Sequence, residues 1–248
     1  MTPKALIIVV LGILYCWVIV STMPYRRQVQ EEKLRTDYFI NLDQKDYHTE
    51  RYYQALIADP KSDPAKVTDV EEELGILKWA KHDLVAAMEA FQKVVAKRKK
   101  PDEIQNKTYN EPWIKSKLLL AGIYRDLGNW DISAGEYKAI LEYDRKFALE
   151  SAKVARDLNN LGLLEYMRAT GFQKDQDRMP AFQKSEEYLN QAIAMWQKVS
   201  GPQSASEASS LWNLYLTQRD MGKVDDSKKT KQLAEAIDEK MGRTCKLP

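Results

Sequence analysis

Apolar residues recur at intervals of three and four along most of the chain, which is the period of amphipathic helices. The clearest stretch is residues 118–141, LLLAGIYRDLGNWDISAGEYKAIL. In it, small residues stand where two helices must approach, aromatic residues stand where they interlock, and Gly128 separates two helical segments. No stretch alternates apolar and polar residues for long enough to predict a sheet. The pattern predicts an all-α chain built from helical hairpins.

The same arrangement of small and aromatic residues recurs elsewhere in the chain. Further copies contain Leu74-Gly75 with Ala87 and Phe91, Leu161-Gly162 with Ala192, and Leu214 with Gly222 and Ala234. A more degenerate copy contains Phe39, Tyr52, Ala55 and Pro60. One hairpin cannot bury its apolar face alone, so neighbouring copies must stack on it. We therefore expect a helical solenoid with a concave groove.

These positions resemble the tetratricopeptide repeat (TPR), a unit of about 34 residues with the patterns W-x2-L-G-x2-Y and A-x3-F. Leu120-Ala121 and Tyr124 stand at the first spacing, and Ala87 and Phe91 stand at the second. Two later strings, DLNNLGLLEY from residue 157 and SLWNLYLTQRDMGKVDDS from residue 210, resemble the kinesin light-chain style of this repeat. The resemblance implies an all-α TPR solenoid of about four to five repeats.

The repeat spacing also divides the chain. Residues 24–67 form a degenerate repeat, 68–241 form the TPR array, and 242–248 form a tail. Insertions near 97–113 and 171–181 lengthen the array beyond a tight repeat. In solenoids such insertions form loops on one edge, and we expect loops at both places.

The N-terminal run over residues 5–22 contains no charged side chain. Such a run gives a helix of roughly 27 Å, close to the thickness of about 30 Å of a bilayer core. We expect residues 5–23 to be a transmembrane signal anchor in contact with the lipid bilayer, after a tail of residues 1–4. A cleaved signal peptide and a lipoprotein signal are alternatives. The chain is then a single-pass membrane protein, and the side of the membrane that carries the repeats stays open because loop charge and export pattern disagree.

Composition limits the chemistry. The formal net charge of +2 argues against broad nucleic-acid binding. Cys16 and Cys245 do not form a disulfide framework, and His48 and His82 lack the spacing of metal ligands. The chain has no Gly-rich phosphate loop and no nucleophile motif. We expect a protein that is not an enzyme and that uses no cofactor, metal or small-molecule substrate.

The resemblance to TPR proteins points to the groove as the functional surface, because the first helix of each pair lines the concave face. In peptide-binding members, an asparagine directly before the packing leucine commonly hydrogen-bonds the backbone of an extended ligand, and Asn160 and Asn213 hold that place. The candidate groove residues are Arg125, Asn159, Asn160, Tyr166, Trp212, Asn213 and Arg219, with Leu163 and Leu216 on the same face. Alternatively, such an asparagine holds a neighbouring helix.

Three functions fit these features. The first is a membrane-anchored scaffold or adaptor that binds a protein or peptide partner through the groove. The second is a structural subunit of a membrane complex that packs through its convex face, for which Met195, Trp196 and Val199 are the expected exposed apolar residues. The third, less favoured, is a regulatory subunit of a separate enzyme.

Overall fold

The computed structural model describes residues 46–98, 109–171 and 175–242, with side chains from residue 50 and, after the second gap, from residue 178. The predicted tail of residues 1–4, the anchor over residues 5–23 and Phe39 lie outside the described residues. Among the helices that are described, none combines the length and the apolar character needed to cross a membrane.

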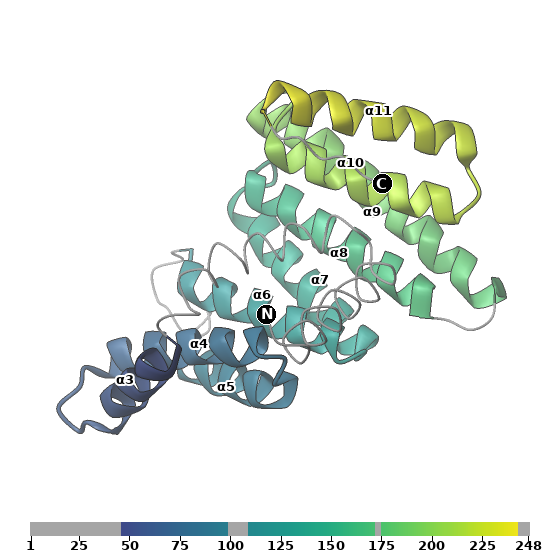
Figure 1. Ribbon diagram of the computed structural model, residues 1–248. Coiled ribbons are helices and arrows are strands. Elements are labelled where there is room, and N and C mark those ends of the chain that lie inside the picture. Colours follow the sequence, from purple (N-terminus) through teal and green to yellow (C-terminus); the bar gives the residue numbers. More distant parts are fainter. Residues whose placement is uncertain (1–45, 99–108, 172–174, 243–248) are drawn as a thin grey trace, which may run out of the picture. The chain divides into compact units, whose positions relative to one another are not determined.

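All regular structure in the described ranges is α-helical, which confirms the predicted all-α class for that part of the chain. The helices, shown in Figure 1, are α3 (Asp46–Ala58), α4 (Pro64–Ala80), α5 (Leu84–Lys97), α6 (Glu111–Asp126), α7 (Trp130–Phe147), α8 (Ala152–Gly171), α9 (Asp175–Ser200), α10 (Ala205–Asp220) and α11 (Val224–Lys240).

Several helices begin at a polar residue whose side chain caps free backbone N–H groups. Asp63 accepts from the backbone N–H of Ala65 at the start of α4, and Asn110 accepts from that of Trp113 at the start of α6. Ser204 caps α10 in the same way. Because these first helices start at defined residues, the buried stripe of each keeps a fixed register against the helices around it.

Consecutive helices pack as hairpins: α4 with α5, α6 with α7, α8 with α9, and α10 with α11 (Figure 1). The second helix of each pair also packs against the first helix of the next pair, and α3 packs against α4. The largest buried cluster joins α6, α7, α8 and α9, with Ile114, Tyr137, Leu158, Leu161 and Ala192 among its members. The hairpins therefore stack through shared cores, as the sequence pattern predicted.

The small residues stand where two helices of one hairpin come closest. A Cβ atom on Gly75 would lie 2.8 Å from Phe91 Cε1, and one on Gly162 would lie 2.6 Å from Leu189 Cγ. In both hairpins a large side chain of the second helix occupies the space that the glycine leaves. The Leu-Gly pair of the sequence pattern is thus a packing requirement of the hairpin.

One expected loop is largely helix. α8 ends at Gly171 and α9 begins at Asp175, so most of the stretch near 171–181 belongs to the first turns of α9. Pro180 lies inside this helix. It removes one main-chain hydrogen bond close to the beginning of the helix, where its ring is tolerated better than in the middle. The expectation of a loop was wrong because a proline this near a helix start does not end the helix. The insertion near 97–113 overlaps α5 and α6 at its ends, and residues 99–108 lie outside the described ranges.

Candidate functional site

The packing leucines of the four first helices, Leu74, Leu120, Leu161 and Leu214, place the residue before each of them at an equivalent position on the inner face. These residues are Glu73 in α4, Leu119 in α6, Asn160 in α8 and Asn213 in α10. The first three are partly exposed, and Asn213 is 6 % exposed. The two asparagines that the sequence makes equivalent therefore differ in access to solvent.

Asn213 is used inside the fold. Its Nδ2 atom donates to Oδ1 of Asn159 over 3.1 Å, and the hydroxyl of Ser210 donates to the same oxygen over 2.9 Å. These bonds join α8 to α10. For Asn213 the structure matches the alternative stated above, in which the asparagine directly before the packing leucine holds a neighbouring helix, and Asn159 is its partner.

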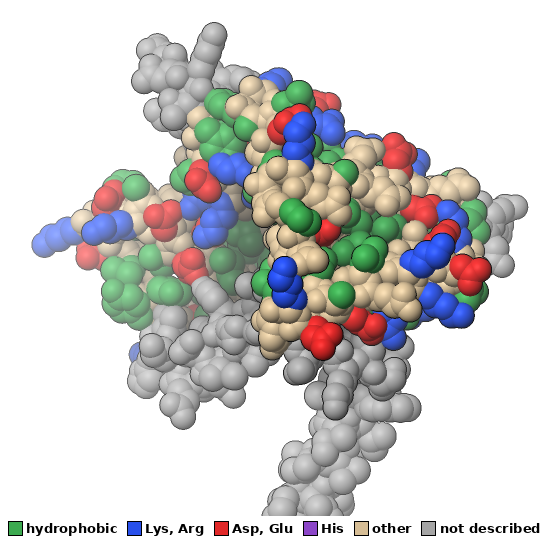
Figure 2. Space-filling view, turned by 90° about the horizontal axis from the view of Figure 1, so that it is seen from above, with side chains coloured by type: hydrophobic (Ala, Val, Ile, Leu, Met, Phe, Trp, Pro, Cys, Tyr) green, Lys and Arg blue, Asp and Glu red, His purple; other side chains and the backbone are tan. Residues whose placement is uncertain are grey.

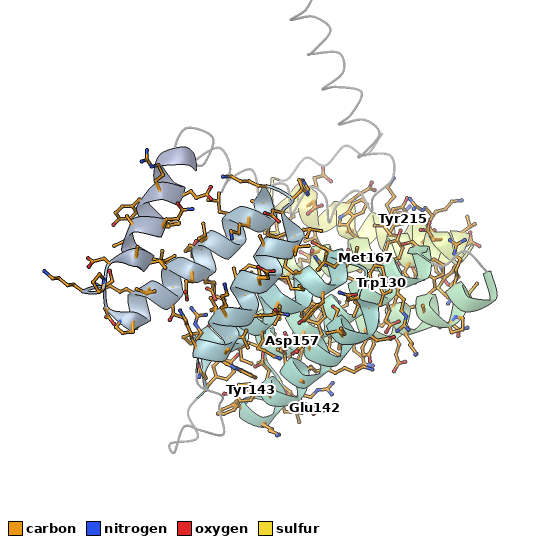
Figure 3. The ribbon with its side chains drawn as sticks, turned by 90° about the horizontal axis from the view of Figure 1, so that it is seen from below. Trp130, Glu142, Tyr143, Asp157, Met167 and Tyr215 are labelled. Carbon is orange, nitrogen blue, oxygen red and sulfur yellow. The ribbon has the colours of Figure 1, made fainter. Side chains whose placement is uncertain are left out.

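Asn160 differs from both. Its side chain is partly exposed, and it takes part in no hydrogen bond within the described part of the chain. Arg156 lies one helical turn before it, Leu163 lies one turn after it and Met167 two turns after it, so these side chains share its face of α8. Figure 3 shows Met167 toward the same end of the helices as Trp130 and Tyr215, with Asp157 and Tyr143 toward the other end.

Trp212 does not line the inner face as expected. It is 1 % exposed and belongs to the core between α10 and α11, where its ring packs edge-on against Tyr215 with centroids 5.6 Å apart. Its Nε1 atom donates to Oδ2 of Asp238 over 3.2 Å. A single step along a helix rotates a side chain by about 100°. Trp212 therefore points at α11, whereas its neighbour Asn213 points at α8.

Tyr166 and Arg219 meet at a carboxylate. Tyr166 is 3 % exposed, and its hydroxyl donates to Oδ2 of Asp220 over 2.8 Å. Burial, followed by the charge of Asp220, raises the pKa of the Tyr166 phenol, which keeps it protonated as the donor. Arg219 donates to Oδ1 of the same carboxylate over 2.8 Å, and its side chain is 50 % exposed. Of the two candidates, Arg219 is the one that reaches solvent.

Arg125 repeats this arrangement in α6, but it is buried. It is 5 % exposed, and it pairs with Asp126 over 2.9 Å. Trp79 of α4 donates its Nε1 hydrogen to the same Asp126 over 2.9 Å. Arg125 and Tyr166 were expected on an accessible inner face, but both are buried. Each contacts an aspartate that links two successive first helices.

The beginning of α6 carries a closed ion network. Glu72 is 2 % exposed, and its carboxylate accepts from Lys115 Nζ over 2.7 Å and from the hydroxyl of Ser116 over 2.8 Å. Arg98 donates to the same carboxylate. The negative charge of the buried Glu72 is therefore balanced by two cations, Arg98 and Lys115.

The outer face has a groove of about 500 Å³ between α9 and α11, floored by α10. Its apolar lining consists of Ile193, Leu211, Leu214, Leu233, Ala236 and Ile237. Leu233 is 59 % exposed. On the side where Figure 1 places α11, hydrophobic side chains lie between groups of charged ones (Figure 2).

The residues that the sequence named for the convex face are less open. Trp196 is 9 % exposed, and Met195 and Val199 are partly buried. The expectation that Trp196 is exposed was wrong. The sequence analysis missed two residues. Leu233 is one turn before the buried Ile237 and is not part of an aromatic motif. Arg156 could have been identified, because it lies four residues before Asn160 and so shares its helix face.

In the part of the chain that the structure describes, no three His, Cys, Asp or Glu side chains are grouped so as to hold a metal ion. The chemistry that the candidate surfaces support is recognition, because they carry exposed amide, guanidinium and apolar groups on helices whose register is fixed by buried contacts.

This stack of helical hairpins is a TPR-like solenoid. No family model and no curated protein matches the chain. Among solved structures, BtubC (BKLC) from P. vanneervenii is similar, with a TM-score of 0.63 and 21 % identity over 93 % of this chain and 88 % of that one. A putative kinesin light chain from Podosopora anserina with nearly identical TPR-like repeats is similar at 16 % identity. A singly substituted form of it gives a TM-score of 0.62 over 88 % of this chain and 97 % of that one. A second structure of this kinesin light chain gives 0.60 over 90 % and 99 %.

These likenesses confirm the TPR-like fold and its resemblance to kinesin light-chain repeats. At such identities they show the fold alone.

Proposed function

We propose that the protein is a membrane-anchored TPR scaffold that binds an extended segment of a partner protein across the inner face of α8. The observation that carries this proposal is the exposure and hydrogen bonding of the Asn160 side chain. Its amide is partly exposed and makes no hydrogen bond to the described residues, whereas the amides of Asn159 and Asn213 bond to each other. An amide that a fold leaves unpaired at the surface is available as both donor and acceptor for a peptide backbone.

The neighbours of Asn160 define the chemistry of the segment that would bind. Arg156 is 36 % exposed on one side, and Met167 offers a partly exposed apolar side chain on the other. Leu163 lies between Asn160 and Met167 along this face of α8 and is 7 % exposed. Such a strip favours an extended peptide that presents backbone groups to Asn160 and an apolar side chain toward Met167.

The membrane anchor is the second part of the proposal. It is supported by the uncharged run over residues 5–22 and its basic flank. Tethering would hold the repeats close to membrane-bound partners, so a groove of modest affinity would suffice. Alkaline extraction of membranes tests this part. The full chain should stay in the membrane pellet, and a chain lacking residues 1–23 should be released. Release of both would overturn the anchor.

Site-specific photo-crosslinking tests the binding surface. A photoreactive amino acid at position 160 of the full chain should give discrete partner adducts in membranes. The same group at Lys138, an exposed position of α7, is the matched control and should give none of them. Asn160→Ala, tested by affinity purification, should lose the crosslinked partner. Equal adducts from both positions, or an unchanged partner after Asn160→Ala, would contradict binding at this face.

The groove between α9 and α11 supports a second candidate, a structural subunit that packs through its outer face. Leu233 is highly exposed there beside an apolar floor. If this candidate is correct, Leu233→Ser should release the complex while Asn160→Ala leaves it intact. The scaffold proposal expects the reverse pattern. Size-exclusion profiles of the detergent-solubilised complex distinguish the two.

A further inference from the structure

Two buried carboxylates meet where α7 passes into α8. Asp144 near the end of α7 is 2 % exposed, and Asp157 in α8 is fully buried. Nη2 of Arg156 donates to Oδ2 of Asp144 over 3.0 Å and to Oδ1 of Asp157 over 2.8 Å. Because both oxygens lie within hydrogen-bond reach of one nitrogen atom, the two carboxyl groups are close neighbours. Figure 3 labels Asp157 at this end of the helices.

The charges of this cluster do not balance. Arg156 is the one cation with an ion pair to either carboxylate in the described ranges, and it supplies a single positive charge. Oδ1 of Asp144 and Oδ2 of Asp157 are buried without a hydrogen-bond donor from any described residue. Two ionised carboxylates would therefore leave a net negative charge in the interior, which is strongly unfavourable. A proton on one carboxyl group removes that charge and supplies a donor to the other group.

The groups around the pair do not supply a second counter-ion. Tyr109 precedes α6, and burial, followed by the nearby Asp144, raises the pKa of its phenol. Lys153 of α8 lies over the Tyr109 ring at 3.4 Å from its centroid. Lys153 is 4.0 Å from Glu111 at the start of α6, so its charge has a partner of its own.

The other two helices packed against α8 face it with separate groups. α10 presents the uncharged Ser210 and Asn213, which bond to Asn159. α9 presents Tyr188. Burial and the charges of Glu165 and Glu187 raise the pKa of its phenol, and Arg145 at the end of α7 lowers it. These charges act on Tyr188, and Arg156 is the cation paired with the two aspartates.

We propose that Asp144 and Asp157 share one proton, and that loss of this proton as the pH rises through neutrality weakens the contact between α7 and α8. The two helices belong to successive repeats, so the pair makes the coupling of the second and third repeats pH-dependent. It also changes the charge beside Arg156, which shares the exposed face of Asn160. The inference concerns the fold and does not depend on the proposed partner binding.

The electrostatics agree with the geometry. Burial raises the pKa of Asp157 to about 7, with Asp144 adding to the rise and Arg156 opposing it. A carboxyl group whose pKa is higher in the folded state binds its proton more tightly there than in the unfolded chain. The stabilisation is complete below the unfolded pKa near 4 and is lost as the pH rises through about 7.

Thermal unfolding of the full chain at pH 6 and pH 8 tests this proposal. Between these pH values the Tm of the wild type should fall by on the order of 5 °C relative to Asp157→Asn, in which the amide donates permanently to Asp144. Asp225→Asn, at an exposed acidic position of α11, is the matched control and should keep the wild-type pH dependence. An identical pH dependence in wild type and Asp157→Asn would overturn the proposal.

A second measurement has its decisive readout in the wild-type protein, so it remains informative even if a variant fails to fold. Carbon-13 NMR of aspartate-labelled wild-type protein should show one carboxyl resonance that titrates near neutral pH, and Asp144→Asn should move its midpoint by at least about one pH unit toward acid. If every aspartate of the wild type titrates below about pH 5, no proton is shared and the proposal is wrong.

Discussion

The indole Nε1 of Trp79 in α4 donates a 2.9 Å hydrogen bond to Oδ2 of Asp126 in α6, and this bond ties the first helices of two successive repeats together. Tyr166 makes the equivalent bond from α8 to Asp220 of α10. In each case the arginine before the aspartate holds its other oxygen. At the intervening junction α8 carries Met167 at the aspartate position. Arg168, the next residue of α8, pairs instead with Asp131 of α7.

Removal of the Tyr166 hydroxyl should destabilise the contact between α8 and α10. Tyr166→Phe keeps the ring against Phe182 and leaves Asp220 with Arg219 alone, so we expect a loss of about 1–2 kcal/mol in the free energy of unfolding. Urea denaturation measures it. Tyr124→Phe is the control, because the Tyr124 hydroxyl is bonded to Gln92 at an exposed site, and it should cost less than about 0.5 kcal/mol. Equal stability of the two variants would show that the bond to Asp220 has no net effect.

Two glycines inside helices should respond to alanine in opposite directions. A Cβ at Gly162 would lie 2.6 Å from Leu189 Cγ and 3.2 Å from the backbone oxygen of Ser185, so Gly162→Ala should destabilise by about 1–3 kcal/mol. A Cβ at Gly135 in α7 would meet no atom within 4 Å, and Gly135→Ala should stabilise by about 0.5–1 kcal/mol through helix propensity. Thermal unfolding of both variants checks the signs. Stabilisation by both changes would mean that the α8–α9 contact adapts without cost.

Substitution of the two adjacent asparagines of α8 should have different effects on stability, because Asn159 holds the fold together and Asn160 is proposed to bind a partner. Asn159→Ala removes the acceptor of Asn213 and Ser210 and should cost about 1–3 kcal/mol, because it leaves buried donors without that partner. Asn160→Ala should leave stability within about 0.5 kcal/mol of wild type. Circular dichroism melts of the two variants measure the difference, and an equally large loss for Asn160→Ala would assign that side chain to the fold.

The hairpins could be predicted from the sequence because their signals are local. Gly162 and Leu189 face each other inside one hairpin, and the Leu-Gly spacing that places the glycine is written in consecutive residues. The relative orientation of Trp212 and Asn213 could not be predicted in this way. Which of two adjacent residues points at α8 and which at α11 depends on how three helices pack, and the repeat pattern does not encode that angle.

The buried acid pair shows the same limit. Asp144 and Asp157 are separated by a turn between two repeats, and each alone is typical of a surface charge on a helix. Their burial follows from the stacking of α7 on α8. The groove residues were predicted as a set because they share a helix face. Whether such a side chain is free to bind a ligand depends on its partners in other helices, and the Tyr166 hydroxyl is already bonded to Asp220 of α10.

The turn between α4 and α5 offers the last prediction. His82 adopts a left-handed backbone with φ of 61°, where the equivalent turns have Gly128 at 76° and Gly222 at 78°. A residue with a side chain is strained in this conformation by roughly 1–2 kcal/mol. Glycine removes the strain, but its unfolded state has more conformational entropy, so the net gain in stability is smaller than the strain. His82→Gly should therefore stabilise the protein by about 0.5–1 kcal/mol in urea denaturation, while Gly222→Ala destabilises it by a similar amount. The backbone bonds that close the turn, from the N–H of residue 82 to Trp79 and of residue 222 to Arg219, match and should persist in both variants. A loss of stability in His82→Gly would mean that the imidazole contributes a contact that outweighs the strained backbone.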